Sequence, residues 1–371
     1  MRALIALITI FTSYTLYAES IELIVKTPFL TSPGDTIYIT GNTSTLCHWK
    51  VDCLALTHLE RNIWKADFDI PNGANVEFKI TRGNWESEAA DQHGNKLSNM
   101  IISSNKQIQK IIVTIPSWKD LAPFGSKNVY LIKSFPAPEI KSKKNIFISL
   151  PESYRTNSKI HYPVIYAHDG QNLFSGSTAA FGNEWGLDEV LSFLNENNMA
   201  QEAIVVGISS DANRTDEYHY YRKGKDYARF IVETLKPFID NNFRTRTGRE
   251  STFMLGSSMG ALISVTMLWQ YPNIFSKVAA ISFPAFAYDN YMFKFLDEFG
   301  APPSDVMLYL DHGGQGQDAQ YAVPVGEWIA KAKQLGLPEE NIHYQVFPFD
   351  DHNEIDWCSR VHIPIKLLLE R

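Results

Sequence analysis

The sequence predicts two domains: a small all-β sandwich, followed by a larger α/β domain built on a mostly parallel sheet. Strand-like segments rich in Ile, Val, Thr and aromatic residues fill the chain from Ile21 to about Trp118. Beyond residue 128, short apolar runs alternate with amphipathic helical segments. At Gly256–Gly260, between one such run and the next helical segment, two glycines bracket Ser-Ser-Met. This pattern is typical of a serine nucleophile on a strand-to-helix turn.

Composition fits a globular protein with one large core and one small one. The 371 residues are 44% hydrophobic and 20% charged, and the formal net charge is −7. Nucleic-acid binding is not expected, because phosphates call for a basic face and no basic tract is present. After the N-terminal segment no run is apolar enough to cross a bilayer, so no membrane span is expected.

The first 18 residues are predicted to be a signal peptide. One arginine precedes an apolar stretch from Ala3 to Phe11, and the small residue Ala18 is followed by polar residues. The apolar stretch is too short to span a membrane. We therefore expect an exported protein, periplasmic or extracellular. A retained N-terminal anchor is the alternative, because Leu16 fits poorly three positions before a cleavage site.

The sandwich is predicted over residues 20–118. Its strand-like segments are 36–41, 63–70, 76–83 and 111–116, and turn-forming Pro-Gly, Pro-Asn-Gly and Arg-Gly-Asn sequences lie between them. Cys47 and Cys53 are close together in a loop-like segment, which favours a disulfide in an oxidising compartment. The third cysteine, Cys358, is interpreted as a buried thiol rather than a nucleophile.

The α/β domain is predicted over residues 128–371. Its strand-like segments are 128–135, 145–150, 163–168, 203–209, 252–256, 277–283, 305–313 and 342–349. Its helical segments are 184–197, 226–243, 259–272, 323–336 and 355–371, and residues 284–300 carry no clear pattern. In open sheets of this kind, functional side chains lie in loops at the carboxyl ends of the strands.

Ser258 is the predicted nucleophile, because it is the middle residue of the glycine-bracketed turn and is raised above the sheet. His352 is the predicted base, since it lies after the last strand and before the last helix, over the same edge. The acid is expected in the segment after the apolar run 305–310, where Asp311 and Asp318 are both candidates. Asp318 is favoured because it lies farther along the loop and can reach back to the histidine, whereas Asp311 is placed to fix the loop.

An ester carbonyl attacked by Ser258 would need donors for its developing negative charge. The backbone N–H groups of Met259, at the helix start, and of Gln171, in the loop after residues 163–168, are predicted to supply them. Asn172 is predicted to add a side-chain contact to the substrate. No cofactor is expected. No metal is expected either, because His168 and its neighbour lack further clustered ligands.

Nine motifs in order resemble the α/β-hydrolase esterases of the enterochelin-esterase and esterase-D-like group. The resemblance extends from about Lys144 to the C-terminus and implies the same roles for Ser258, Asp318, His352, Met259 and Gln171. The motifs are HDGQNLF, GNEWGLDEVL, IVVGIS, RTDEYHYY, FIVETLKPFID, LGSSMGALIS, YPNIFSKVAAIS, YLDHGGQGQDAQY and HNEIDW.

The N-terminal segment resembles a starch-binding-type carbohydrate module over about Ile21–Pro116. Its tryptophans include Trp49, Trp64 and Trp85. Exposed tryptophans stack on sugar rings, and Trp85, in a loop after a glycine, is the predicted sugar contact. Trp64 is expected in the core. A domain that only packs against the hydrolase is the alternative.

The main functional prediction is a secreted serine esterase that acts on a small-molecule or glycan ester. One alternative is a non-catalytic carbohydrate-binding protein on a hydrolase scaffold, because a fold does not fix a function. A serine peptidase is the other, because the same triad cleaves amides.

Overall fold

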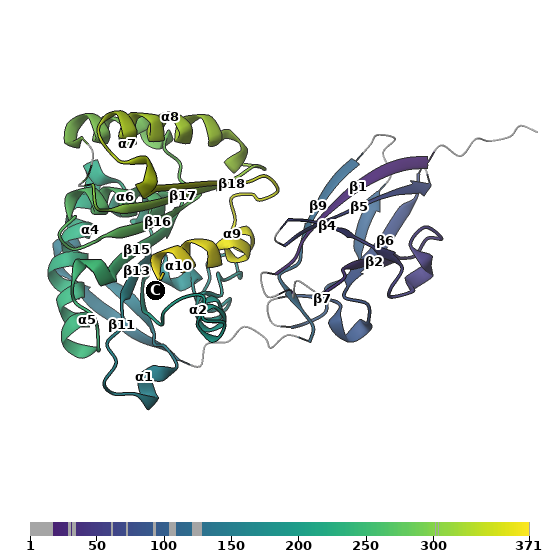
Figure 1. Cartoon of the computed structure of the whole chain (residues 1–371), viewed down its shortest axis with the longest axis horizontal. Coiled ribbons are helices and arrows are strands. Elements are labelled where there is room, and N and C mark those ends of the chain that lie inside the picture. Colours follow the sequence, from purple (N-terminus) through teal and green to yellow (C-terminus); the bar gives the residue numbers. More distant parts are fainter. Residues whose placement is uncertain are drawn as a thin grey trace, which may run out of the picture. The chain divides into compact units, whose positions relative to one another are not determined.

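The computed structural model describes residues 18–28, 31, 35–60, 62–71, 73–91, 94–103, 109–120, 128–300, 302 and 304–370. The predicted signal peptide lies outside these residues except for Ala18, where the first strand begins. The chain forms two compact units that divide near residue 120 (Figure 1).

The N-terminal unit is all-β, as predicted. Two four-stranded sheets have the orders β4-β5-β1-β9 and β3-β2-β6-β8, and β10 pairs with β7. Side chains alternate along β5, with Ala66, Phe68 and Ile70 buried and their neighbours facing outward, which is the pattern of a strand with one face in a core. The strands are β1 Ala18–Lys26, β2 Tyr38–Gly41, β3 Leu54–Ala55, β4 Thr57–Glu60, β5 Ile63–Pro71, β6 Asn75–Thr81, β7 Ala89–Ala90, β8 Met100–Ser103, β9 Gln109–Thr114 and β10 Ser117–Trp118.

The C-terminal unit contains an eight-stranded sheet with the order β11-β12-β14-β13-β15-β16-β17-β18. The β11–β12 and β12–β14 pairs are antiparallel and the remaining pairs are parallel, which confirms the mostly parallel sheet. The strands are β11 Val129–Ala137, β12 Ser142–Ser149, β13 Val164–His168, β14 Ile204–Ile208, β15 Thr252–Ser257, β16 Lys277–Ile281, β17 Met307–Gly313 and β18 Ile342–Phe347.

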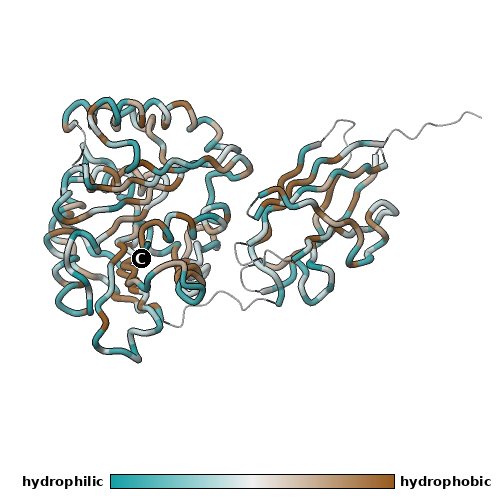
Figure 2. Tube along the Cα trace, viewed as in Figure 1, coloured by the Kyte–Doolittle hydropathy of each residue, from teal (hydrophilic) through white to brown (hydrophobic). Residues whose placement is uncertain are grey.

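Helices cover both faces of this sheet. Val164 and Tyr166 of β13 belong to one buried cluster, whereas Ile165 and Ala167 belong to the other. Strands buried on both faces are mostly apolar, and stretches of brown run through this unit in Figure 2. The α-helices are α1 Ser153–Thr156, α2 Leu187–Glu196, α3 Arg214–Glu217, α4 Lys225–Arg229, α5 Lys236–Asn242, α6 Met259–Gln270, α7 Ala287–Phe299, α8 Ala322–Gln334, α9 Glu354–Arg360 and α10 His362–Leu368.

Two helical segments differ from the sequence prediction. The predicted closing helix is two helices, α9 and α10, because Pro364 lacks a backbone N–H and its ring conflicts with the carbonyl of Arg360. Residues without a clear pattern form α7, whose first turn contains left-handed residues at Tyr288–Asn290. Among the described residues no helix combines the length and apolarity needed to cross a membrane.

Candidate active site

The turn between β15 and α6 holds Ser258 in a strained conformation with positive φ, at φ 53° and ψ −123°. Close contacts favour glycine on both sides of Ser258, most strongly at Gly256. A Cβ atom on Gly256 would lie 2.3 Å from the carbonyl oxygen of Gly260, and one on Gly260 would lie 3.2 Å from Cβ of His168. The backbone N–H of Ser258 donates to the carbonyl oxygen of Ile281 at 2.9 Å, which fixes the turn to the neighbouring strand. The side chain is therefore held above the sheet edge.

Three side chains from separate loops form a continuous hydrogen-bonded relay. The Oγ atom of Ser258 lies 2.9 Å from Nε2 of His352, and Nδ1 of the same imidazole lies 2.7 Å from Oδ1 of Asp318. His352 follows β18, and Asp318 follows β17. The structure therefore brings together the three residues that the sequence singled out for the triad.

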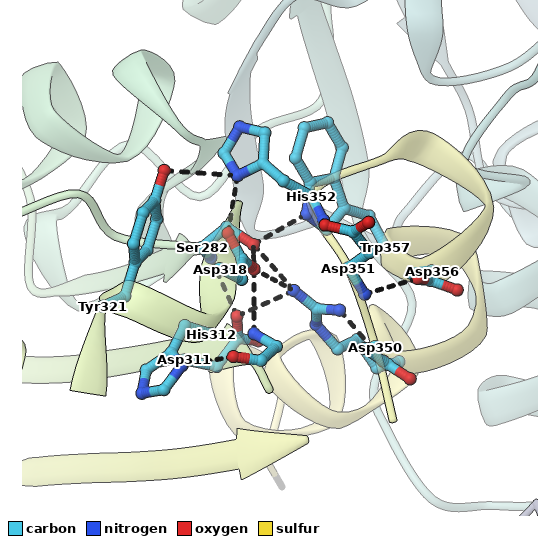
Figure 3. A network of polar contacts seen from close by, with 12 residues as sticks. Ser282, Asp311, His312, Asp318, Tyr321, Asp350, Asp351, His352, Asp356 and Trp357 are labelled. Carbon is cyan, nitrogen blue, oxygen red and sulfur yellow. Dashed lines mark hydrogen bonds and ion pairs between the residues drawn. The ribbon is translucent and has the colours of Figure 1, made fainter. Parts of the chain in front are cut away.

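Asp318, rather than Asp311, is the carboxylate that contacts the histidine (Figure 3). It is fully buried, and its Oδ2 accepts hydrogen bonds from the Ser282 hydroxyl at 2.5 Å and the Gly313 N–H at 2.8 Å. Burial raises the pKa of this carboxyl, but the hydrogen bonds from His352, Ser282 and Gly313 outweigh burial and hold the pKa below its usual value. Asp318 is therefore a carboxylate at neutral pH.

Asp311 fixes the neighbouring loop instead. Its Oδ1 accepts the backbone N–H of Ser282 at 2.8 Å, and its Oδ2 accepts the Tyr309 hydroxyl at 2.9 Å. Burial raises the pKa of Asp311. Asp311 therefore supports the loop that carries Asp318, and it makes no hydrogen bond to the imidazole of His352.

Two aromatic rings constrain the imidazole of His352. The rings of Trp357 and Tyr321 meet it edge to face, with centroid distances of 5.0 and 5.8 Å. Edge-to-face packing of this kind is favourable and limits rotation of the ring. The Nε2 atom is thereby kept pointing at Ser258.

The predicted oxyanion donors lie on two segments that pack together. Met259 is the first residue of α6, where backbone N–H groups have no partner inside the helix. Gln171 lies in a 3-10 turn, Gly170–Asn172, directly after β13. A Cβ atom on Gly260 would lie 3.6 Å from Oδ2 of Asp169, so the turn after β13 lies against the start of α6.

This turn after β13 is held rigidly. Asp169 has a left-handed φ of 54° and forms two hydrogen bonds of 2.8 Å with Arg214. The side-chain amide of Gln171 bonds Ser210 twice, donating at 2.9 Å and accepting its backbone N–H at 3.0 Å. The backbone of Gln171 is therefore fixed in place by its own side chain.

Asn172 is buried, and its amide contacts other protein groups. The Oδ1 atom accepts the Ala180 N–H at 2.9 Å, and Nδ2 donates to Glu354 at 3.5 Å. These contacts place Asn172 in the support of the 175–180 loop, and its contact with substrate stays a prediction.

The sequence analysis did not identify two polar residues that lie behind Asp318, namely Ser282 and Arg360. Ser282 follows β16 at the same sheet edge, and a polar residue after the apolar run KVAAI was a usable signal. Arg360 is fully buried in α9, and a lone arginine in a helix otherwise packed on the core was the other signal. Ser282 is the last residue of the motif YPNIFSKVAAIS, but neither Ser282 nor Arg360 was given a role.

The N-terminal unit contains a pocket of about 280 Å³ next to two tryptophans. Trp85 is 39% exposed, whereas Trp64 is buried, as predicted. The Cys47–Cys53 disulfide that the sequence predicted closes the loop that carries Trp49. The pocket is lined by Trp49, Lys79, Trp85, Glu88, Lys96 and Asn99.

Across the described residues, no three His, Cys, Asp or Glu side chains gather as metal ligands would.

Comparison with known families gives two matches along the chain. The model of the family described as "Putative esterase" matches residues 137–362, and the model of the "Starch binding domain" matches residues 19–111. Both agree with the resemblances seen in the sequence.

Individual relatives are distant. The uncharacterized protein YbbA of Bacillus subtilis (strain 168) is 29% identical over 154 residues, which is 38% of this chain and 56% of that protein. The chain thus matches little more than half the length of this curated relative. A solved ferulic acid esterase has a TM-score of 0.54 at 20% identity, covering 66% of this chain and 99% of its own. The enterochelin esterase of Shigella flexneri has a TM-score of 0.53 at 10% identity, covering 90% and 87%. At these identities the solved structures show the shared α/β-hydrolase fold.

Proposed function

Because the chain belongs to the Putative esterase family, we propose that it is an exported serine hydrolase that cleaves carboxylic esters. The observation that carries the proposal is the relay from Ser258 through His352 to Asp318, at 2.9 and 2.7 Å. Both distances are within hydrogen-bonding range, which proton transfer requires. A buried carboxylate behind the imidazole is the arrangement that activates a serine.

In the proposed reaction, Oγ of Ser258 attacks the ester carbonyl carbon while Nε2 of His352 takes the hydroxyl proton. Asp318 holds the Nδ1–H tautomer and stabilises the imidazolium. The carbonyl oxygen, now negatively charged, accepts hydrogen bonds from the backbone N–H groups of Met259 and Gln171. The intermediate collapses, the C–O bond to the alcohol breaks, and the alkoxide takes the proton from Nε2.

Water then releases the acyl group by the same base. His352 removes a proton from water as its oxygen attacks the acyl-Ser258 carbonyl, and the serine oxygen leaves with that proton. The products are a carboxylic acid and the free enzyme. Every proton that leaves a nucleophile passes through Nε2, which is why the orientation of the imidazole matters.

A fluorophosphonate probe tests the nucleophile directly. We expect it to label the wild-type protein and Ser257→Ala, and to leave Ser258→Ala unlabelled. Ser257 is the matched control because it is the adjacent serine and is buried at the end of β15. Labelling of Ser258→Ala at the wild-type rate would refute the assignment. Hydrolysis of p-nitrophenyl acetate, compared with hydrolysis of a p-nitroanilide, then separates an esterase from a peptidase.

We also propose that the N-terminal unit binds an α-glucan of the starch type. The observation behind this second function is the pocket with Trp49 and Trp85 on its wall, in a segment matched by the starch-binding model. Indole rings at an open pocket offer flat apolar faces for sugar rings. Trp85 is held in place because the Asn84 side chain caps its turn at 2.9 Å and Lys119 donates to its carbonyl oxygen at 3.1 Å.

Trp49 is presented on a constrained loop. Cys47, His48 and Trp49 all have left-handed φ values, 54°, 48° and 69°, and the disulfide to Cys53 closes the loop around them. A loop fixed before binding loses little entropy when a sugar docks. The glucan would then hold the hydrolase near carbohydrate esters, which is the substrate class that the two units together favour.

Titration calorimetry with β-cyclodextrin tests the glucan site. Trp85→Ala is expected to weaken binding at least about tenfold, because a stacked aromatic face is lost. Leu59→Ala is the control, since Leu59 is also exposed in this unit but does not line the pocket. Equal affinity of the two variants would place glucan binding elsewhere, and no binding by the wild type would reject it.

A further inference from the structure

We propose that Ser282 is a positioning residue of the hydrolase: its hydroxyl, oriented by Trp357 and Arg360, keeps Asp318 ionised and aligned behind His352. The inference rests on the proposed function, because it concerns the same triad. It adds a buried polar network to the three residues, and Figure 3 shows the contacts of this network around Asp318.

The direction of the Ser282 hydroxyl follows from its partners. Its Oγ accepts the indole N–H of Trp357 at 2.9 Å and an N–H of Arg360 at 2.8 Å. Tryptophan and arginine side chains can only donate, so these two bonds use the lone pairs of the hydroxyl. The single hydroxyl proton is left for Asp318 Oδ2, 2.5 Å away.

Asp318 consequently faces donors on both oxygens. Oδ2 receives the Ser282 hydroxyl and the Gly313 N–H, and Oδ1 lies 2.7 Å from Nδ1 of His352, which is a donor in the Nδ1–H tautomer. A proton on either oxygen would oppose one of these donors. The surroundings therefore accommodate the carboxylate and disfavour the acid, and a carboxylate at Oδ1 holds the proton of the imidazole on Nδ1. That leaves the Nε2 lone pair free to take the Ser258 proton.

The backbone of Ser282 is also held. Its φ is 46°, a left-handed conformation that costs a non-glycine residue free energy. The N–H of Ser282 donates to Asp311 Oδ1 at 2.8 Å while its hydroxyl donates to Asp318. Asp311 thus accepts the backbone N–H of Ser282, and Asp318 accepts its hydroxyl. Together these two hydrogen bonds fix the position of the hydroxyl beside Asp318.

The positive charge of Arg360 lowers the free-energy cost of burying the carboxylates around Ser282. It is fully buried, and its guanidinium lies 2.9 Å from Asp350, 3.4 Å from Asp311 and 3.7 Å from Asp318. One cation among three buried carboxylates lowers the cost of keeping Asp318 ionised. The charged and titratable groups around Asp318 include His352, Arg360 and Asp311, with Asp350 also bound to the guanidinium. Tyr321 also belongs to this set, and its hydroxyl lies 3.5 Å from Nδ1 of His352.

The test uses two variants that both lack the hydroxyl. Ser282→Ala keeps the strained backbone, whereas Ser282→Gly relieves it. If the hydroxyl carries the effect, both variants lose kcat by roughly 10- to 100-fold with KM within about twofold, as expected for a charge-assisted hydrogen bond. Ser282→Cys keeps nearly the same volume and a weak donor, and it serves as the test if Ser282→Ala and Ser282→Gly impair folding. Its kcat should lie between the kcat of those two variants and that of the wild type.

Ser276→Ala is the matched control. Ser276 and Ser282 flank the same strand, β16, and both are buried, but the Ser276 hydroxyl has no hydrogen-bond partner within the described part of the chain. We expect Ser276→Ala to retain wild-type kcat.

Two readouts go beyond stability. The acid limb of kcat/KM should move to higher pH in Ser282→Ala, because Asp318 loses a donor that favours its charged form. The far-downfield proton resonance of the Nδ1–H in His352 should weaken in Ser282→Ala and persist in Ser276→Ala. This resonance needs no substrate, so it tests the inference even if the wild type cleaves no ester, which would instead reject the proposed function. Folded Ser282 variants with wild-type kcat, acid limb and resonance would overturn the inference.

Discussion

Replacing Asp318 by asparagine should invert the hydrogen-bond direction of the relay. An asparagine side chain has one acceptor oxygen and one NH₂ donor. In the structure Oδ2 accepts two hydrogen bonds, from Ser282 and Gly313, whereas Oδ1 accepts one, from His352. The amide oxygen is best placed on the side of the two donors, so the NH₂ group turns to the imidazole.

An NH₂ group can only donate, so Nδ1 of His352 must then carry the lone pair and Nε2 the proton. The opposite amide orientation would set the NH₂ against Ser282 and Gly313, a conflict of buried donors that costs about 1–3 kcal/mol. With Nε2 protonated, the imidazole cannot accept the Ser258 proton. We expect kcat to fall about 10⁴-fold, which corresponds to about 5 kcal/mol and matches the effect of this exchange in a Ser-His-Asp triad.

Initial rates with p-nitrophenyl acetate and the rate of fluorophosphonate labelling measure this loss. Both should fall together, while circular dichroism and the unfolding temperature stay near wild type. Asp305→Asn is the control for the substitution itself, because that carboxylate is 66% exposed and pairs only with Arg249 in the ion pairs of the described residues. An Asp318→Asn enzyme that keeps more than roughly a tenth of the wild-type kcat would refute the tautomer argument.

Three further predictions concern folding and pH. Gly256→Ala should destabilise the hydrolase unit by roughly 2 kcal/mol or more, because its Cβ would lie 2.3 Å from the Gly260 carbonyl oxygen; a thermal unfolding temperature equal to wild type would contradict this. Glu184→Gln should raise the unfolding temperature at pH 8 and hardly at pH 4.5. Burial raises the pKa of Glu184 to about 7, so the wild type loses stability as pH rises from 4.5 through 7, and an equal effect at both pH values would exclude this cause. Cys53→Ser should lower the stability of the N-terminal unit by about 2 kcal/mol through loss of the closed loop with Cys47, which differential scanning calorimetry with and without reductant can check.

Much of the architecture was predictable because the local patterns agree with the global fold. Alternating burial along β5 and continuous burial along strands such as β13 distinguish a one-sided sheet from a doubly covered one. Helix ends were harder to predict from the sequence. Pro364 breaks the closing helix, and the left-handed residues at the start of α7 interrupt the helical periodicity of that segment. Propensity and period carry no information about such interruptions until the chain is packed.

The sequence predicted the two domains, favoured a disulfide between Cys47 and Cys53, and selected Ser258 and His352 as nucleophile and base. A glycine-bracketed serine between strand and helix, and a histidine after the last strand, are local signals with few interpretations. Between Asp311 and Asp318 the sequence only favoured one.

The choice between those two carboxylates depends on the folded chain. They are seven positions apart, with Asp311 in β17 and Asp318 in the 3-10 turn after that strand. Asp318 lies 2.7 Å from the imidazole, whereas Asp311 accepts the backbone N–H of Ser282. The same is true of Ser282 and Arg360, which are 78 residues apart and meet at 2.8 Å. Contacts between distant segments depend on how strands β16, β17 and the helices after β18 pack, and no local pattern in the chain records that arrangement.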